Sequence, residues 1–312
     1  MRDAFIRVLT ERAAEDSSIM LITGDLGFGV LSDYARRFPK QFLNAGVAEQ
    51  NMTGLACGLA LEGHKVFTYS IANFTTLRCL EQLRNDVCYH NANVTAVAVG
   101  GGFSYGQLGM SHFATEDLSI LRSLPGMTVV APTGVWETEE ATRALVAHAG
   151  PAYLRLDKGC AASNPKPGED FAIGASRQIR DGKDVCLIAT GGILSEAMGA
   201  ADLLALAGIN ARILSMHTIK PLDEKAIALA ARECGGIVTL EEHTTMGGLG
   251  GAVAEACLKI GSVPSFFISV GIDDAFPNVV GDQQYLRKLY GMDAAAVASR
   301  IALRIHSAGA TR

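Results

Sequence analysis

The hydrophobic pattern alternates between short apolar runs and longer stretches in which apolar residues recur every three or four positions. Short runs bounded by Gly, Asp or Asn are typical of buried strands, and the second pattern is typical of amphipathic helices. In the first half of the chain, strands are predicted at 19–23, 42–45, 65–70, 94–99, 127–131 and 152–156, and helices at 3–15, 31–38, 49–61, 75–90, 115–124 and 137–149. Strands that alternate with helices indicate a parallel sheet covered on both faces.

The pattern is interrupted over residues 159–182 and then restarts. Asn, Pro, Gly and acidic residues crowd this segment, which is predicted to be a linker. Beyond it, strands are predicted at 185–190, 211–216, 236–241 and 264–270, and helices at 194–207, 223–233 and 249–259. We therefore expect an α/β chain of two three-layer α/β/α domains with mainly parallel sheets, at residues 1–165 and 183–312.

The composition narrows the classes of function. Apolar residues make up 49% of the chain and charged residues 19%, which excludes a disordered protein. The net charge is −5, from 27 Lys and Arg against 32 Asp and Glu, and no strong basic patch occurs, so nucleic acid is not expected as a partner. No apolar stretch is long enough for a membrane span, and residues 1–16 carry charges throughout, unlike a signal peptide.

The cysteine and glycine patterns exclude several common sites. The seven cysteines are scattered and contain no C-x-x-C pair, which favours free thiols in a reducing cytoplasm over disulfides or a zinc site. The glycines at 27–29, 100–102 and 247–251 match neither the dinucleotide-binding pattern nor the P-loop. The last of these segments is instead predicted to be a tight turn into the helix at 249–259.

The most distinctive motif is Asn-Ala-Gly-Val-Ala-Glu-Gln-Asn-Met at residues 44–52. A predicted strand ends here, small residues form a turn, and Glu49 opens a helix. An acidic residue at a helix N-terminus has an ordinary structural role, because it interacts favourably with the helix dipole. In this context, however, the segment resembles the motif in which thiamine diphosphate enzymes of the transketolase group carry their cofactor-activating glutamate.

Further motifs extend this resemblance in the order expected for the C-terminal section of that group. They are Thr23-Gly-Asp-Leu26, similar to an A-D-L turn; Phe74 with Arg78-x-x-Glu-Gln82, similar to F-x-x-R-A-x-D-Q with one extra residue; Ser111-His112 with Leu121-Arg122-x-x-Pro-Gly-Met127; Ile219-Lys-Pro-Leu-Asp223; and Glu241-Glu-His-x-x-x-Gly-Gly-Leu-Gly250. The whole chain resembles the pyrimidine-binding and C-terminal domains of a split transketolase-like enzyme.

The resemblance implies catalytic and cofactor-binding roles. The carboxyl group of Glu49 would hydrogen-bond to N1′ of the cofactor's aminopyrimidine and so favour the tautomer that accepts the thiazolium C2 proton. Phe74 would stack on the aminopyrimidine, and His112 would lie above the thiazolium and handle protons of substrate hydroxyls. From the residues alone, Phe74 is equally a core aromatic and His112 a hydrogen-bonded loop histidine.

Three more residues belong to the cofactor side of the implied site. Asp25 and Leu26 lie in the turn that would contact the cofactor or the interface between subunits, and Arg78 follows Phe74 in the matching motif. An aspartate at such a position is also an ordinary turn residue.

The substrate side departs from the family pattern. Lys158 falls where the family places an arginine that holds the sugar phosphate, although a solvated loop lysine is the alternative. Glycines occupy 100–102, where the family has a cation or a histidine, and Leu108 replaces an aspartate that binds a donor hydroxyl. These changes favour an unusual ketose or a substrate without a normal phosphate. Tyr105, with Ser104 and Gln107, is the candidate replacement contact, and a structural role in the Gly-rich loop is the alternative.

The resemblance also implies a partner. Family members bind the diphosphate through Mg²⁺ with a G-D-G…N motif in a preceding domain, and Gly24-Asp25-Leu26 is not that motif. We therefore expect no metal ligands here, and an N-terminal subunit that carries the diphosphate and Mg²⁺. Self-association into a heterotetramer is expected, because cofactor sites in this group lie between chains.

The leading hypothesis is a subunit of a thiamine diphosphate-dependent transketolase, which moves a two-carbon ketol unit from a ketose to an aldose. Two alternatives stay open: a decarboxylating member, of the deoxyxylulose phosphate synthase or 2-oxoacid dehydrogenase β-chain type, and a catalytically inactive scaffold subunit. Among the remaining residues, the acidic residues at 137–140 are predicted to form a solvated helix start, His217 to lie at a surface strand end, and His243 to lie in a loop.

Overall fold

The computed structural model describes residues 1–309 and contains two mainly parallel sheets. The first has seven strands in the order β10-β5-β6-β4-β3-β1-β2, and the second has five in the order β12-β11-β8-β9-β7. The strands are β1 (Ile19–Thr23), β2 (Phe42–Asn44), β3 (Lys65–Ile71), β4 (Val94–Val99), β5 (Thr128–Val130), β6 (Ala152–Leu156), β7 (Arg177–Arg180), β8 (Val185–Ala189), β9 (Ala211–Ser215), β10 (Thr218–Lys220), β11 (Ile237–Thr244) and β12 (Phe267–Ile272). The edge strands β10 and β7 are antiparallel to their neighbours, and the other pairs are parallel.

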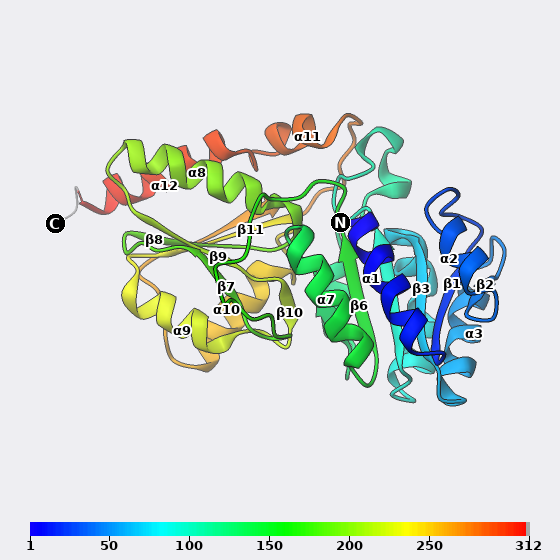
Figure 1. The fold of residues 1–312 in the computed structure, drawn as a ribbon. Coiled ribbons are helices and arrows are strands. Elements are labelled where there is room, and N and C mark those ends of the chain that lie inside the picture. Colours follow the sequence, from blue (N-terminus) through cyan, green and yellow to red (C-terminus); the bar gives the residue numbers. More distant parts are fainter. Residues whose placement is uncertain (310–312) are drawn as a thin grey trace.

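Helices cover both faces of each sheet. They are α1 (Arg2–Glu15), α2 (Ser32–Arg37), α3 (Glu49–Leu61), α4 (Ala72–Thr75), α5 (Leu80–Gln82), α6 (Asp117–Ser123), α7 (Val135–Ala147), α8 (Leu194–Leu206), α9 (Glu224–Glu233), α10 (Leu249–Lys259), α11 (Gln283–Leu289) and α12 (Ala294–Gly309). In Figure 1, α1 and α7 lie side by side on one face of the first sheet, and α8 and α12 lie together on one face of the second. The expected α/β class with layered helices is confirmed.

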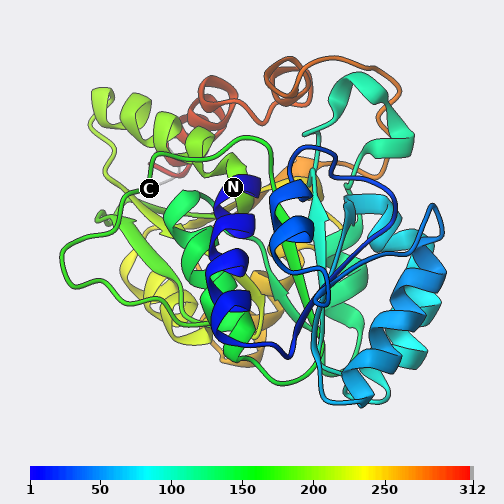
Figure 2. The same cartoon turned by 45° about the vertical axis from the view of Figure 1, so that its right-hand side comes forward.

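Alternating side chains along each strand divide the interior into three hydrophobic cores. Because successive strand residues point to opposite faces, Leu21 packs with α1 and α7, whereas Ile22 packs into a central core with α3, α9 and α10. In the second sheet, Ile188 faces the same central core and Leu187 faces α8 and α12. The central core therefore joins the two sheets, which lie against each other in Figure 2.

The predicted helix at 75–90 is wrong as a single element. The structure has α4, a 3₁₀ turn (Leu77–Cys79), α5 and a π-helix (Leu83–Cys88) instead. The first break follows two β-branched threonines, and the Thr76 hydroxyl donates a hydrogen bond to the carbonyl of Ala72. Such a side-chain bond competes with helical pairing, so the backbone turns here.

The segment at 159–182 is more than a linker, because it contains β7, which pairs with β9 in the second sheet. Conversely, β10 belongs to the second half of the sequence but pairs with β5 in the first sheet. The hydrophobic pattern hides β7, because the strand reads Arg-Gln-Ile-Arg. Each edge strand therefore binds the two halves of the molecule together.

A buried ion pair explains the position of β7. The guanidinium of Arg177 lies 2.7 Å from the Glu137 carboxylate, and both side chains are buried. Glu137 also accepts hydrogen bonds from the backbone and hydroxyl of Thr133 and from the hydroxyl of Ser215. The prediction of a solvated helix start is therefore wrong for Glu137, because this carboxylate finds four donors inside the fold.

The two histidine predictions are also wrong. His217 is buried and its ring stacks on Phe171 at 4.3 Å between centroids. His243 is buried in β11, where Nδ1 donates a hydrogen bond to the Thr244 carbonyl and Nε2 accepts one from the backbone of Ser119. Both residues lie where the two halves of the chain meet, a contact that no local pattern reveals.

Arg177→Met should lower the free energy of unfolding by about 3–5 kcal/mol, because it leaves the buried Glu137 carboxylate without its cation. Chemical denaturation measures the change. Arg180→Met is the matched control on the same strand: its pair with Asp202 is exposed, so the expected loss is below about 1 kcal/mol. Equal losses for the two variants would contradict the assigned role of Arg177.

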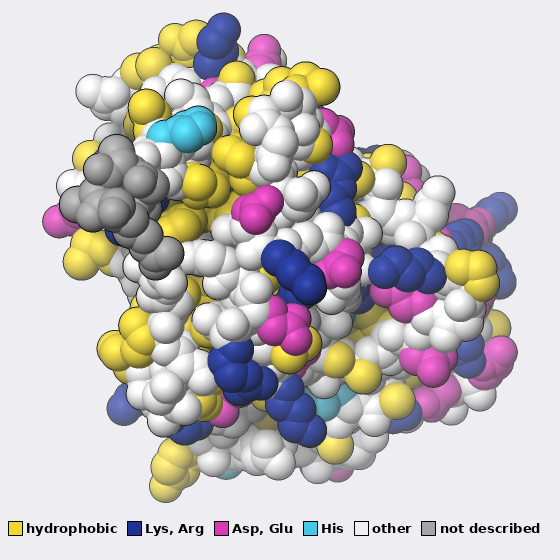
Figure 3. All heavy atoms as spheres, turned by 90° about the vertical axis from the view of Figure 1, so that its left-hand side faces the viewer, with side chains coloured by type: hydrophobic (Ala, Val, Ile, Leu, Met, Phe, Trp, Pro, Cys, Tyr) yellow, Lys and Arg dark blue, Asp and Glu magenta, His cyan; other side chains and the backbone are white. Residues whose placement is uncertain are grey.

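Within residues 1–309, no helix is long and apolar enough to cross a bilayer. Figure 3 views the end of the molecule formed by the second sheet and its helices, where acidic and basic side chains are interspersed with apolar ones.

Candidate active site

The candidate residues gather where parallel strands of the first sheet end. Asp25 follows β1, Glu49 follows β2, Phe74 follows β3, His112 lies in the loop after β4, and Lys158 follows β6. Ligands of open α/β sheets bind at the carboxyl ends of the strands, because the loops that diverge there leave room. Residues separated by more than a hundred positions are thus brought to one edge.

Glu49 is the first residue of α3, and its side chain is buried, with 4% of the residue exposed. Its Oε2 accepts a hydrogen bond of 2.9 Å from Nη1 of Arg78. Gly24 makes room for this carboxyl group, because a Cβ atom at position 24 would lie 3.3 Å from Cγ of Glu49. The carboxyl group is therefore held between the end of β1 and the turn after α4.

Phe74, Arg78 and His112 form a continuous group beside Glu49. The Arg78 guanidinium lies over the Phe74 ring at 4.2 Å from the centroid, a cation–π arrangement. The His112 ring meets Phe74 edge-on at 5.3 Å between centroids, and its Nδ1 lies 2.9 Å from the Ser111 hydroxyl. The broken helix is what places Phe74 and Arg78 on the same side as Glu49.

Tyr105 and Lys158 line a cavity of about 590 Å³, together with Leu108 and Gln283. The Tyr105 ring is 6.3 Å from the His112 ring, so this cavity adjoins the Glu49 group. Burial raises the pKa of Tyr105, and the nearby Arg2 guanidinium opposes that shift. Sequence reasoning missed Arg2, which lies at the start of α1 and carries no recognisable motif.

Asp25 and Leu26 shape the turn beside the site, and their hydrogen bonds go to residues other than Glu49. Asp25 has φ 58°, in the left-handed region, and its backbone and carboxylate pair with the side chain of Asn44 at 3.0 and 2.9 Å. The Leu26 carbonyl accepts a hydrogen bond from the Thr23 hydroxyl. Asn44 also accepts one from the backbone of Gly46, so Asp25 helps to order the turn that leads to Glu49.

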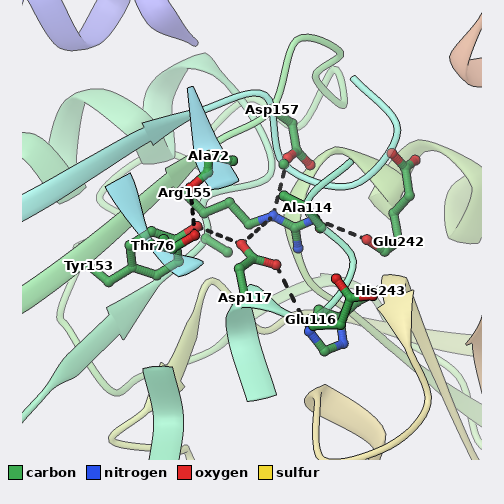
Figure 4. Close-up of polar contacts among 12 residues, drawn as sticks. Ala72, Thr76, Ala114, Glu116, Asp117, Tyr153, Arg155, Asp157, Glu242 and His243 are labelled. Carbon is green, nitrogen blue, oxygen red and sulfur yellow. Dashed lines mark hydrogen bonds and ion pairs between the residues drawn. The ribbon is translucent and has the colours of Figure 1, made fainter. Parts of the chain in front are cut away.

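A second group of charged residues lies behind this site. The sequence analysis named Glu242 and His243 only as part of a motif and missed the group that they form. Figure 4 shows Arg155 between Asp117 and Asp157, with Glu242 and His243 reaching the group from β11. The buried guanidinium of Arg155 is balanced by the buried carboxylates of Asp117 and Asp157. The sequence alone does not predict this pairing. Among the described residues, no group of three or more His, Cys, Asp or Glu side chains is arranged to hold a metal ion.

Comparisons with known proteins agree with this arrangement. Residues 1–162 match the family model for the transketolase pyrimidine-binding domain, and residues 174–297 match that for the transketolase C-terminal domain. One subunit of an apulose-4-phosphate transketolase of Phocaeicola vulgatus is 38% identical over 94% of this chain and 93% of its own length. A 6-deoxy-6-sulfo-D-fructose transketolase subunit of a Clostridium species is 36% identical over 94% and 91%.

A solved structure described as a split gene transketolase, in an inactive β4 tetramer, matches with a TM-score of 0.88 and 34% identity over 98% of both chains. A 1-deoxy-D-xylulose-5-phosphate synthase of Geobacter sulfurreducens is also 36% identical over 93% of this chain, which spans 46% of that enzyme. On these grounds, the chain belongs to the transketolase family and contains the family's pyrimidine-binding and C-terminal domains.

Proposed function

We propose that this chain is the subunit that supplies the pyrimidine-binding half of a thiamine diphosphate-dependent transketolase. The observation that carries the proposal is the buried Glu49 carboxyl group at the start of α3, beside an aromatic ring and a histidine at the same sheet edge. A scaffold subunit would have no need of this combination.

The residues present fit an aminopyrimidine. Oε1 of Glu49 accepts no hydrogen bond within residues 1–309, so it is available to a ring nitrogen, and Phe74 is half-buried beside it. Gly24 keeps the space next to the carboxyl group free of a side chain. When bound, thiamine diphosphate supplies a nucleophilic carbon that forms and breaks bonds to a substrate carbonyl carbon. Glu49 would hold the aminopyrimidine by a hydrogen bond, and Phe74 would contact its face.

His112 would move protons of substrate hydroxyl groups. Its Nδ1 shares a hydrogen bond with Ser111, so Nε2 is the nitrogen left to exchange a proton. An imidazole nitrogen within reach of a substrate hydroxyl suits a group that removes a hydroxyl proton and later returns it.

The diphosphate and Mg²⁺ would be held by a second polypeptide. The relatives named as transketolase subunits are matched over more than nine-tenths of their length, which supports a division of the enzyme between two chains. We propose that it joins an N-terminal subunit, with the cofactor between them, and that two such pairs form a heterotetramer.

The proposed substrate is a ketose that carries an anionic group. Lys158 is the cationic side chain among the described residues that line the 590 Å³ cavity, and the exposed Leu108 supplies an apolar wall. The two relatives are named for a phosphorylated and a sulfonated sugar, which are both anions. A lysine can bind either group as a point charge.

Lys158→Ala should raise KM for the anionic ketose and lower kcat/KM by about 10–100-fold, because one charged hydrogen bond is lost. Steady-state kinetics of the reconstituted complex measure this. Lys183→Ala removes an exposed lysine that does not line the cavity and should leave both constants unchanged. An equal effect on a neutral ketose would mean that Lys158 does not bind the anionic group.

The function is tested by mixing this chain with a candidate N-terminal subunit, thiamine diphosphate and Mg²⁺. Transfer of a two-carbon unit from a ketose to an aldose, without release of CO₂, is the expected result. Condensation of a 2-oxoacid with release of CO₂ would favour the decarboxylating alternative. A stable complex that performs neither reaction would favour the scaffold.

A further inference from the structure

The loop that carries His112 and Tyr105 is closed at its base. The backbones of Gly102 and Ala114 exchange two hydrogen bonds, of 2.9 and 3.0 Å. We call residues 102–114 the substrate loop. The substrate loop carries the site residues Tyr105, Leu108 and His112. The position of this loop therefore decides where His112 lies relative to Phe74.

Both ends of the substrate loop are buried in the C-terminal half of the molecule. Phe103 and Phe113 meet edge-on at 5.1 Å between centroids, and Phe103 stacks on Tyr290 at 5.5 Å. The two phenylalanines belong to the hydrophobic core under α8 and α12, not to a core of the first sheet. The loop therefore extends from one domain and packs on the other.

One carboxylate of the second sheet binds the loop directly. Glu242 in β11 is 1% exposed, and its Oε1 accepts hydrogen bonds from the Phe103 backbone at 2.5 Å and from Gln283 at 2.8 Å. Its Oε2 is paired with the Arg287 guanidinium. The backbone carbonyl of the same residue and the Ala114 carbonyl both accept from Nη2 of Arg155, at 2.9 and 3.2 Å. Glu242 thus contacts the first end of the loop directly, and Arg155 bridges its backbone to the other end, as Figure 4 shows.

The substrate loop packs tightly against Glu242 and Gly281 of the C-terminal half. A Cβ atom at Gly102 would collide with Oε1 of Glu242, and one at Gly106 would collide with the Gly281 carbonyl oxygen. Gly281 also donates a backbone hydrogen bond to the carbonyl of Gly106, at 3.2 Å. The loop therefore packs closely against the surface that the C-terminal domain presents to it.

We propose that Glu242 is a positioning residue, through which the C-terminal domain sets the substrate loop and hence the place of His112. The proposal rests on the proposed function in that it assigns His112 a proton-transfer role. It gives the C-terminal domain a part in turnover although none of its groups need touch the reacting atoms. Arg287 holds Glu242, and Glu242 holds the loop.

Glu242→Gln tests the proposal in the complex of this chain with its N-terminal subunit. The variant keeps the shape of the side chain but loses the charge that binds the Phe103 N–H and Arg287. We expect kcat/KM for ketol transfer to fall by about 10–100-fold, since a charged hydrogen bond is lost. Backbone hydrogen exchange of residues 102–114 should become faster, whereas exchange of α3 and the affinity for thiamine diphosphate should not change.

Glu241→Gln is the matched control, because it is the neighbouring buried carboxylate on the same strand. Successive strand residues face opposite sides, and Glu241 accepts from the backbones of Leu249 and Gly250 at the start of α10. This variant should alter exchange in α10 and leave exchange of the substrate loop and turnover unchanged. A merely structural role of buried charge would make the two variants alike.

Arg287→Lys is a second test, which changes the ion-pair partner of Glu242 and keeps the Glu242 carboxylate itself. It should loosen the substrate loop in the same direction as Glu242→Gln, with a smaller fall in kcat/KM. Unchanged exchange of residues 102–114 in both variants would overturn the proposal. If the wild-type complex shows no ketol transfer but the variants loosen the loop, the structural link stands and the proposed function fails, so the two failures are separable.

Discussion

Glu49→Gln is expected to lower kcat for ketol transfer by about 10²–10⁴-fold, the range typical of a lost general acid–base group. Glutamine keeps the size of the side chain and can still accept a hydrogen bond. It cannot share a proton with a ring nitrogen as a carboxyl group does. The loss should therefore fall mainly on kcat, measured with saturating cofactor in the reconstituted complex.

Glu62→Gln is the control for this change, because Glu62 lies exposed at the opposite end of the same helix. It should have wild-type turnover. If Glu49→Gln also kept full turnover with the partner present, the carboxyl group would have no role in activation and the scaffold hypothesis would be favoured.

His112→Asn should lower kcat by about 10²-fold or more, because the asparagine amide cannot take and return a proton near neutral pH. Asparagine preserves a polar group of similar reach next to Ser111. The affinity for thiamine diphosphate should stay close to that of the wild type, since His112 is assigned to the substrate and not to the aminopyrimidine.

The comparison for His112 is His90→Asn, an exposed histidine whose Nδ1 lies within hydrogen-bond distance of backbone carbonyls of the π-helix and whose ring meets Tyr89 edge-on. Equal and unchanged kcat for the two asparagine variants would remove His112 from the mechanism. A fall in cofactor affinity without a fall in kcat at saturation would move it to the cofactor side.

The sequence predicts most of the architecture because buried parallel strands are nearly continuous apolar runs. Val94–Val99 and Val185–Ala189 are recognisable for this reason, and each places a loop at the sheet edge. β7 is invisible to the same test, since its stability comes from Arg177 pairing with the distant Glu137 and not from apolar side chains. Local periodicity also does not reveal that the Thr76 hydroxyl bonds to the Ala72 carbonyl, in competition with the backbone hydrogen bonds of a helix.

The candidate site also contains residues that the sequence predicts and residues that only the structure reveals. Glu49, Phe74 and His112 are identifiable because short motifs carry them, and the sheet topology then explains why they meet. Glu242 and Arg155 are buried polar residues that also contact each other's domain, and no stretch of sequence contains those contacts. Local sequence patterns do not reveal contacts between domains. In this protein, such contacts support the substrate loop that carries His112.

The most direct test of the account is calorimetric binding of thiamine diphosphate with Mg²⁺, first to this chain alone and then to its mixture with a candidate N-terminal subunit. The account predicts weak or no binding alone and tight binding in the mixture, because the pyrimidine and diphosphate halves of the site come from different chains. Tight binding to this chain alone, or none to a complex shown to form, would contradict it.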